Sequence, residues 1–109
     1  MTEPRVDEAD IEATASALER GEGVLVDVRE DFEWRRGHAA GARHIPLMEL
    51  PSRLAELAPD APVYLMCATG SRSGHAAEYL GRHGFARAVN VRGGTVAWAK
   101  AGLPIEREG

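Results

Sequence analysis

Apolar residues fall into short runs along the chain. Residues 23–28 (GVLVDV) and 62–67 (PVYLMC) are β-branched and apolar without clean alternation, which is typical of strands covered on both faces. Further short strands are expected at residues 42–45, which Pro46 ends, and at residues 88–91. The two longer runs therefore belong in the middle of a parallel sheet.

Helical spacing fills the intervals between these strands. Residues 7–20 carry apolar side chains on one face, so an amphipathic helix is expected there, with Asp7 as its N-cap and Gly21 as the residue that ends it. Three more helices are expected, at residues 50–57, 71–83 and 95–100. The alternation of helices and strands predicts an α/β fold. A chain of 109 residues fits one core, so we expect a single domain over residues 1–109 with an ordered part at about residues 6–106.

Charge and composition narrow the functional classes. Seventeen acidic and thirteen basic residues leave a net charge of −4, which is not the pattern of a protein that binds nucleic acid or an anionic membrane. The longest apolar run, residues 63–68, is far too short to span a bilayer, and the N-terminus lacks the apolar stretch of a secretory signal. We therefore expect the protein to be cytoplasmic. We also expect it to be a monomer or a weak homodimer.

The single cysteine, Cys67, carries the strongest chemical signal. It ends a predicted strand, and a short loop containing Gly70 leads from it into a helix that begins near Arg72. Backbone N–H groups of such a loop, with the positive end of the helix dipole, stabilise an anion at its centre. A thiolate is such an anion, so the pKa of Cys67 is expected below that of a free thiol. Further hydrogen bonds to a bound oxyanion are expected from the hydroxyl groups of Thr69, Ser71 and Ser73.

The cysteine, its loop and the histidines also have structural explanations. A lone cysteine at a strand end can also be a small buried apolar side chain, and a loop of this kind can be an ordinary connection. One cysteine excludes an intramolecular disulfide and a cysteine-rich zinc site. The histidines lack the spacing of metal ligands, so structural roles are expected for His38, His44, His75 and His83.

Structural roles are also expected for several charged and aromatic residues. Asp27, Arg29 and Arg43 could line the mouth of a pocket, but a buried ion network is favoured, because an unpaired buried charge is costly. Trp34 and Trp98 are expected to pack at the edges of the core.

Three separated segments carry a family pattern. Residues 24–46 contain Asp-Val-Arg at a strand end, an acid-plus-aromatic pair, Gly-His, Gly-Ala and Ile-Pro. Residues 67–73 (CATGSRS) combine a cysteine, a glycine, an arginine and a serine, and residues 90–104 contain a Gly-Gly pair before an Ala-Trp helix. In this order and spacing, the chain resembles the rhodanese homology domain, a sulfurtransferase family, over nearly its whole length.

The resemblance implies a fold and a reaction. The fold would be α/β, with an open, parallel, five-stranded sheet and helices on both faces. Cys67 would be catalytic: its thiolate would take a sulfane sulfur from a small-molecule donor such as thiosulfate, hold it as a persulfide and pass it to cyanide, a thiol or a partner protein. No metal or organic cofactor is expected. The substrate-binding residues would be Ala68, Thr69, Gly70, Ser71, Arg72 and Ser73.

Two other functions stay open at this point. A rhodanese-like phosphatase or arsenate reductase would need a loop one residue longer than the four residues that separate Cys67 from Arg72. A non-catalytic regulatory module would typically lack the cysteine.

The chain departs from the family pattern at two places. Ala68 stands where many relatives carry a bulkier or basic residue, which removes a possible charge from the pocket and weakens the case for thiosulfate as the natural donor. Ala39 and Ala40 stand where Ile-Pro is frequent.

Overall fold

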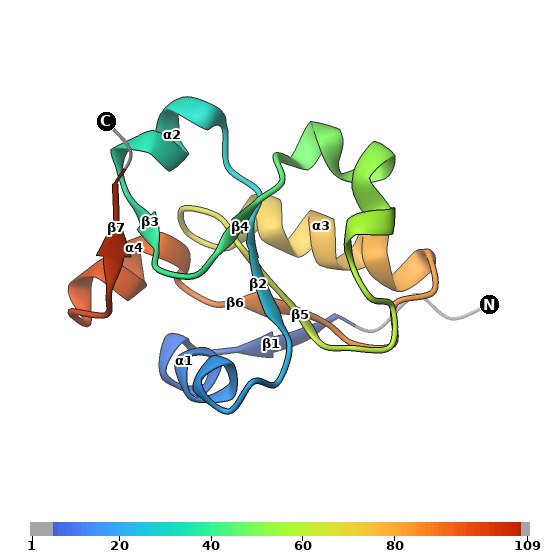
Figure 1. Ribbon diagram of the computed structural model, residues 1–109, viewed down its shortest axis with the longest axis horizontal. Coiled ribbons are helices and arrows are strands. Elements are labelled where there is room, and N and C mark those ends of the chain that lie inside the picture. Colours follow the sequence, from blue (N-terminus) through green and yellow to red (C-terminus); the bar gives the residue numbers. More distant parts are fainter. Residues whose placement is uncertain (1–5, 108–109) are drawn as a thin grey trace.

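A five-stranded parallel sheet, in the order β1-β6-β5-β2-β4, forms the centre of the protein (Figure 1). The structure is a computed structural model and describes residues 6–107. The strands of this sheet are β1 (Asp7–Ala9), β2 (Val24–Asp27), β4 (Arg43–His44), β5 (Val63–Met66) and β6 (Ala88–Val91). The predicted α/β class, with a parallel sheet of five strands, is confirmed.

Helices cover both faces of the sheet (Figure 1). The helix α3 (Ser71–Arg82) and the 3₁₀ helix η1 (Leu47–Glu56) pack on one face, and α1 (Ile11–Glu19) and α4 (Gly94–Lys100) pack on the other. Alternate residues of β5 point to opposite faces, so that Leu65 joins the first core cluster and Met66 the second. The unalternating apolar sequence of β5 follows from burial on both sides.

The register of the strands aligns their carboxyl ends. Asp27 lies opposite Met66, so β2 and β5 end side by side. Asn90 of β6 lies opposite Leu65, on the other side of β5. The segments that leave these strands therefore meet at one edge of the sheet, which is where parallel α/β folds place their ligands.

The N-terminal prediction was wrong in detail. Residues predicted as the first turn of a helix, with Asp7 as the N-cap, instead form the edge strand β1, which pairs with β6. The helix begins at Ile11, and Asp10 is the N-cap: its carboxylate accepts a hydrogen bond from the Ala13 N–H at 2.8 Å. Helical spacing of apolar residues begins only at Ile11, so tertiary pairing decides the conformation of the segment before it.

Other elements were not predicted or differ from the prediction. The short helix α2 (Asp31–Arg36) and the antiparallel pair β3 (His38–Ala39) and β7 (Ile105–Glu106) were missed. The helix predicted at residues 50–57 is instead the 3₁₀ helix η1, which begins at Leu47, contains Pro51 and is kinked at Arg53. A proline inside a helix removes a backbone donor, which favours this irregular form.

A buried ion pair connects the carboxyl end of β2 to the segment before β3. Arg29 donates to both carboxylate oxygens of Asp27, with nitrogen–oxygen distances of 2.8–3.0 Å, and to the Gly37 carbonyl oxygen at 2.7 Å. The buried pair predicted for these two residues is therefore present. Arg43 does not join it: it is exposed and donates to the Glu56 carbonyl oxygen.

Candidate active site

Cys67 is the first residue after the central strand β5, whereas the sequence predicted it as the last residue of that strand. Its side chain is directed to the face covered by α3, and the residue is only 1% exposed. The loop turns into α3 at Gly70, whose φ of +117° lies in the region that favours glycine. This turn brings the start of α3 back over the cysteine sulfur.

Hydrogen-bond donors surround that sulfur. The Gly70 N–H donates to Cys67 Sγ at 3.0 Å, and Ser73 Oγ lies 3.3 Å from Sγ. Burial acts to raise the pKa of the Cys67 thiol, but hydrogen bonds from the Ser73 hydroxyl and from the N–H groups of Ser73, Gly70 and Thr69 outweigh it and lower the pKa. The site thus favours a thiolate, which is the reactive form of a cysteine.

Asn90 in β6 supports this arrangement from the neighbouring strand. Ser73 Oγ lies 2.6 Å from Asn90 Oδ1, so its single proton is donated either to this oxygen or to the sulfur, and Asn90 Nδ2 donates to the Gly70 carbonyl oxygen at 3.1 Å. One amide side chain therefore holds both donors that face the sulfur. The sequence analysis did not single out Asn90, although it is the first residue of the third family segment.

The N-terminus of α4 holds the backbone of the active-site loop through two hydrogen bonds. The Thr95 N–H donates to the Cys67 carbonyl oxygen at 2.9 Å, and the Val96 N–H donates to the Ala68 carbonyl oxygen at 3.2 Å. Gly94 makes this approach possible: a Cβ atom on it would lie 2.2 Å from the Cys67 carbonyl oxygen. With the carbonyl groups held by α4, the N–H groups of the loop are free to face the sulfur.

Arg72 has a partner that the sequence analysis did not identify. It forms a bidentate ion pair with Glu33 of α2, with nitrogen–oxygen distances of 2.7 and 2.9 Å. Arg72 holds the pKa of Glu33 at about 2, and the Glu33 carboxylate raises the pKa of Arg72. Arg72 lies at the start of α3, as the sequence predicts, and the Glu33 carboxylate offsets its charge.

The remaining predicted loop residues differ in exposure. Ala68 and Gly70 are half-buried, whereas Thr69 and Ser71 are exposed. Only Ser73 among the three predicted hydroxyl donors contacts the sulfur. Ala68 and Thr69 thus border the solvent side of the loop, and Ser73 lies inside it.

Two histidines and both tryptophans have packing roles. His38 and His44 stack on Trp34, with ring centroids 3.4 and 4.7 Å away, and Trp98 of α4 is buried. No three His, Cys, Asp or Glu side chains form a potential metal site within residues 6–107. Over the same range, no helix has the length and apolar character needed to cross a membrane.

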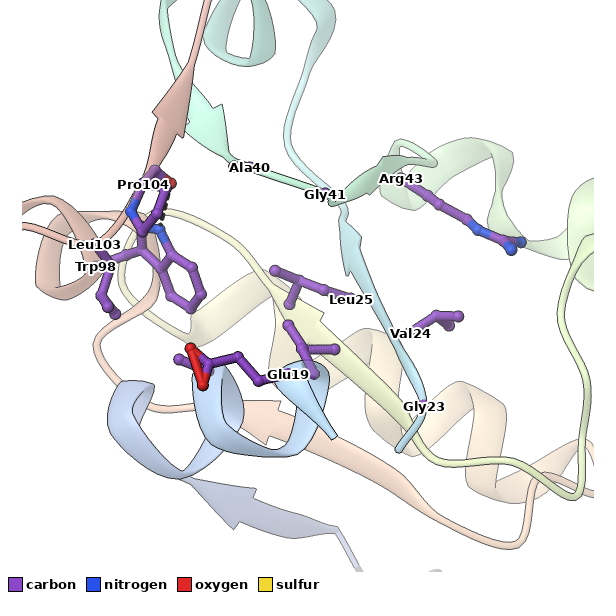
Figure 2. A pocket seen from close by; sticks show the side chains of 12 residues that line it. Glu19, Gly23, Val24, Leu25, Ala40, Gly41, Arg43, Trp98, Leu103 and Pro104 are labelled. Carbon is purple, nitrogen blue, oxygen red and sulfur yellow. Dashed lines mark hydrogen bonds between the residues drawn. The ribbon is translucent and has the colours of Figure 1, made fainter. Parts of the chain in front are cut away.

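An apolar groove of about 480 Å³ lies on the opposite face of the sheet from the cysteine side chain (Figure 2). Trp98, Leu25 and Leu103 contribute to its lining, and Glu19 and Arg43 also border it. Residues of the 67–73 loop do not line this groove.

Comparison with known proteins agrees with this geometry. Residues 10–101 match the family model described as the rhodanese-like domain. The chain is 40% identical over 101 residues to a sulfurtransferase of Allochromatium vinosum, covering 92% of this chain and 94% of the relative. It is 35% identical to the thiosulfate sulfurtransferase GlpE of Vibrio cholerae, covering 89% and 92%.

Solved structures give the same assignment. The crystal structure of a rhodanese-related protein from Thermoplasma volcanium superposes with a TM-score of 0.84 at 30% identity, over 94% of this chain and 99% of the other. The chain belongs to the rhodanese-like domain family. Its relatives include proteins named as sulfurtransferases.

Proposed function

We propose that the protein is a sulfurtransferase that carries sulfur as a persulfide on Cys67. The observation that carries this proposal is the set of donors around Sγ, with the Gly70 N–H at 3.0 Å and the Ser73 hydroxyl at 3.3 Å. Donors in this position stabilise negative charge on sulfur before and after a second sulfur atom is added. The names of two relatives, a sulfurtransferase and a thiosulfate sulfurtransferase, support the same reaction class.

The first step loads the sulfur. The Cys67 thiolate attacks the outer sulfur of thiosulfate, a sulfur–sulfur bond forms to Cys67, and the original sulfur–sulfur bond breaks to release sulfite. One negative charge stays on the persulfide and two leave with sulfite, so charge and atoms balance. In this step the loop N–H groups and Ser73 stabilise the charge on the cysteine-bound sulfur.

The second step unloads it. A thiophilic acceptor, cyanide in an assay or a thiol in the cell, attacks the outer sulfur and Cys67 leaves as its thiolate. The lowered pKa of Cys67 favours departure in this form. No base is needed in either half-reaction when the nucleophile is already ionised, and the cycle requires no cofactor.

We further propose that the protein acts in the cytoplasm. The mechanism needs Cys67 as a free thiol between turnovers, and cytosolic thiols are kept reduced. Cys67 is a free cysteine in the structure.

Intact-mass measurement after incubation with thiosulfate tests the proposal. The expected result is a gain equal to one sulfur atom on the wild-type chain, removed by cyanide with formation of thiocyanate. Cys67→Ser is the matched control and should gain no mass, because an alcohol at this position is not ionised. An unmodified wild-type chain after incubation with thiosulfate, a polysulfide or a low-molecular-weight persulfide would overturn the proposal. Hydrolysis of a phosphate ester or reduction of arsenate by the same preparation would favour the alternative activity.

A further inference from the structure

A groove with an arginine-rich lining lies beside the active-site loop. It has a volume of about 510 Å³ and lies between α4 and the chain that runs from α2 into β3. Thr95 and Val96 line it, and their N–H groups donate to the carbonyl oxygens of Cys67 and Ala68. The groove is therefore separated from the active-site loop by a single turn of α4. We refer to it below as the arginine groove; its other lining residues include Arg29, Arg36, Ile105 and Arg107.

Within the part of the chain that the structure describes, two of its arginines have no carboxylate partner. Among residues 6–107, neither Arg36 nor Arg107 forms an ion pair, and the guanidinium group of Arg36 lies 5.8 Å from the centre of the Phe32 ring. Arg29 at the same groove is neutralised by Asp27. Among the described residues, no carboxylate offsets the charge of Arg36 or Arg107, so this part of the chain lines the groove with positive charge, although the whole chain has a net charge of −4.

The acidic side chains near the groove in residues 6–107 have other partners. Glu33 pairs with Arg72, and Asp31 pairs with Arg35. Glu106 lies between Ile105 and Arg107 in sequence, but its carboxylate lies near the Gly41 N–H and His38 Nε2. The residues on either side of it line the groove, as alternation along an extended segment predicts.

Three exposed apolar side chains lie at or beside this groove. Phe32, which packs near Arg36, is 60% exposed, and Val96 and Ile105 are 46% and 37% exposed. They belong to α2, α4 and β7, which Figure 1 shows together at the carboxyl end of the sheet. Val96 and Ile105 line the arginine groove itself. Exposed apolar side chains next to unpaired cations are typical of a surface that another macromolecule covers.

We propose that the arginine groove docks an acidic segment of a protein acceptor, which thereby brings its own cysteine to the sulfur on Cys67. This inference rests on the proposed function and names the class of acceptor. The unpaired charges of Arg36 and Arg107 are complementary to carboxylates, and Val96 and Ile105 are complementary to apolar side chains between them. A single small oxyanion would use the cations but would leave the apolar side chains uncovered.

The transfer itself is an exchange of one sulfur atom. The acceptor thiolate attacks the outer sulfur of the Cys67 persulfide, a new sulfur–sulfur bond forms on the acceptor, and the bond to Cys67 Sγ breaks. Cys67 leaves as a thiolate, and the negative charge of the persulfide stays on the transferred sulfur. No external oxidant or reductant is required.

The test compares two synthetic acceptors of opposite charge. One is the acidic peptide acetyl-EDLEDLCGLDEL-amide, and the other is acetyl-KKLKKLCGLKKL-amide, with lysine in place of every acid. Full-length protein, loaded with sulfur and freed of donor, is mixed with each peptide, and the second-order rate of persulfide transfer is followed by mass spectrometry. We expect the acidic peptide to react about tenfold faster or more at low ionic strength, and added salt to reduce the difference.

Charge-reversal variants locate the preference in the groove. The double variant Arg36→Glu/Arg107→Glu should lose about tenfold in rate with the acidic peptide, whereas Arg36→Lys/Arg107→Lys should retain most of the preference. Transfer to dithiothreitol, a neutral thiol, should stay within about twofold of wild type. Arg87→Glu, beside Asp7 at the amino end of β6, reverses one charge outside the groove and should keep the preference, whereas the single variant Arg36→Glu should lose part of it.

Two outcomes would overturn the docking proposal. One is equal transfer to the acidic and basic peptides. The other is a charge-reversed double variant that raises the thiosulfate KM but transfers to the acidic peptide like wild type, which would make the groove a donor site. Fluorescein-labelled peptides with serine in place of cysteine report binding by anisotropy without chemistry. Failure of the chain to form a persulfide would thus refute the proposed function, while anisotropy would still decide the docking.

Discussion

Arg72 and Glu33, which lie 39 residues apart in the chain, join α3 to α2 through two parallel hydrogen bonds of 2.7 and 2.9 Å. Glu33 also accepts a hydrogen bond from the Glu30 N–H at 3.0 Å, within the capping box of α2. A single carboxylate therefore closes the first turn of α2 and holds the arginine of the active-site loop. This pairing fixes α2 beside the site.

Glu33→Gln is expected to destabilise the protein near neutral pH by about 1–2 kcal/mol, because the pair is partly buried but screened by solvent. The pKa of Glu33 is about 2 in the folded protein, below its ordinary value of 4.5. The ion pair therefore stabilises the wild-type protein fully at pH values above 4.5, and this stabilisation is lost as the pH falls towards 2. Denaturant titrations at several pH values should show the gap between wild type and Glu33→Gln closing over this range. A gap that is constant with pH would mean that the glutamate stabilises through packing alone.

Ser73→Ala is expected to raise the pKa of the Cys67 thiol, since it removes a hydrogen bond to the thiolate. The pH dependence of alkylation by iodoacetamide measures this pKa. In the wild type the midpoint should lie below about 8.5, the value for a free cysteine. The comparison uses the midpoint and not the absolute rate, because burial of the cysteine slows access of the reagent in both proteins. A wild-type midpoint at or above that of a free thiol would contradict the assignment of a stabilised thiolate.

Ala68→Arg is expected to lower the thiosulfate KM by about three- to tenfold, with a smaller change in kcat. Ala68 is half-buried next to the exposed Thr69, so a long side chain at this position can extend from the loop towards solvent. A cation at the rim attracts the thiosulfate dianion by about 1 kcal/mol after screening. Steady-state assays at low and high salt should show the gain and its erosion. Ala68→Gln, which adds length without charge, is the control; an equal gain there would rule out an electrostatic cause.

Gly94→Ala is expected to abolish most activity and to destabilise the fold by about 3 kcal/mol or more. The added Cβ would meet the carbonyl oxygens of Cys67 and Ala68 at 2.2 and 2.6 Å, in a residue whose φ is +53°. Gly102→Ala is the control that separates backbone strain from steric clash. The φ of Gly102 is +74°, but no atom lies within 4 Å of the added Cβ. That variant should lose about 1 kcal/mol and keep its activity. Thermal melting and the thiosulfate:cyanide assay measure both effects, and similar behaviour of the two variants would argue against contact between α4 and the loop.

The fold was predictable from the sequence where burial leaves a local pattern. The runs at 23–28 and 62–67 are apolar on both sides because helices cover both faces of these strands. Their position inside a parallel sheet could therefore be inferred. By contrast, β1 has only three residues, and its pairing with β6 depends on a chain segment about eighty residues away. No local pattern reports such a contact.

The candidate site shows the same division. Cys67, Gly70 and Ser73 lie within one loop and one helix turn, so their proximity could be inferred from spacing. Glu33 and Asn90 reach the loop from α2 and β6, and only the fold brings them there. The ion pair of Arg72 could not be predicted, because its partner Glu33 lies in a helix that the sequence analysis did not identify.

The contact between α4 and the active-site loop also determines what happens when the protein is divided into two fragments. Every side chain around the sulfur is present by residue 90, yet the loop carbonyl groups are held by N–H groups of residues 95 and 96. A fragment that stops before α4 would retain the nucleophile and all of its donors but would lack the anchor that orients them. Reactivity at Cys67 should return when a peptide spanning α4 is supplied separately, so that fragment complementation would depend on a segment that contributes no side chain to the sulfur.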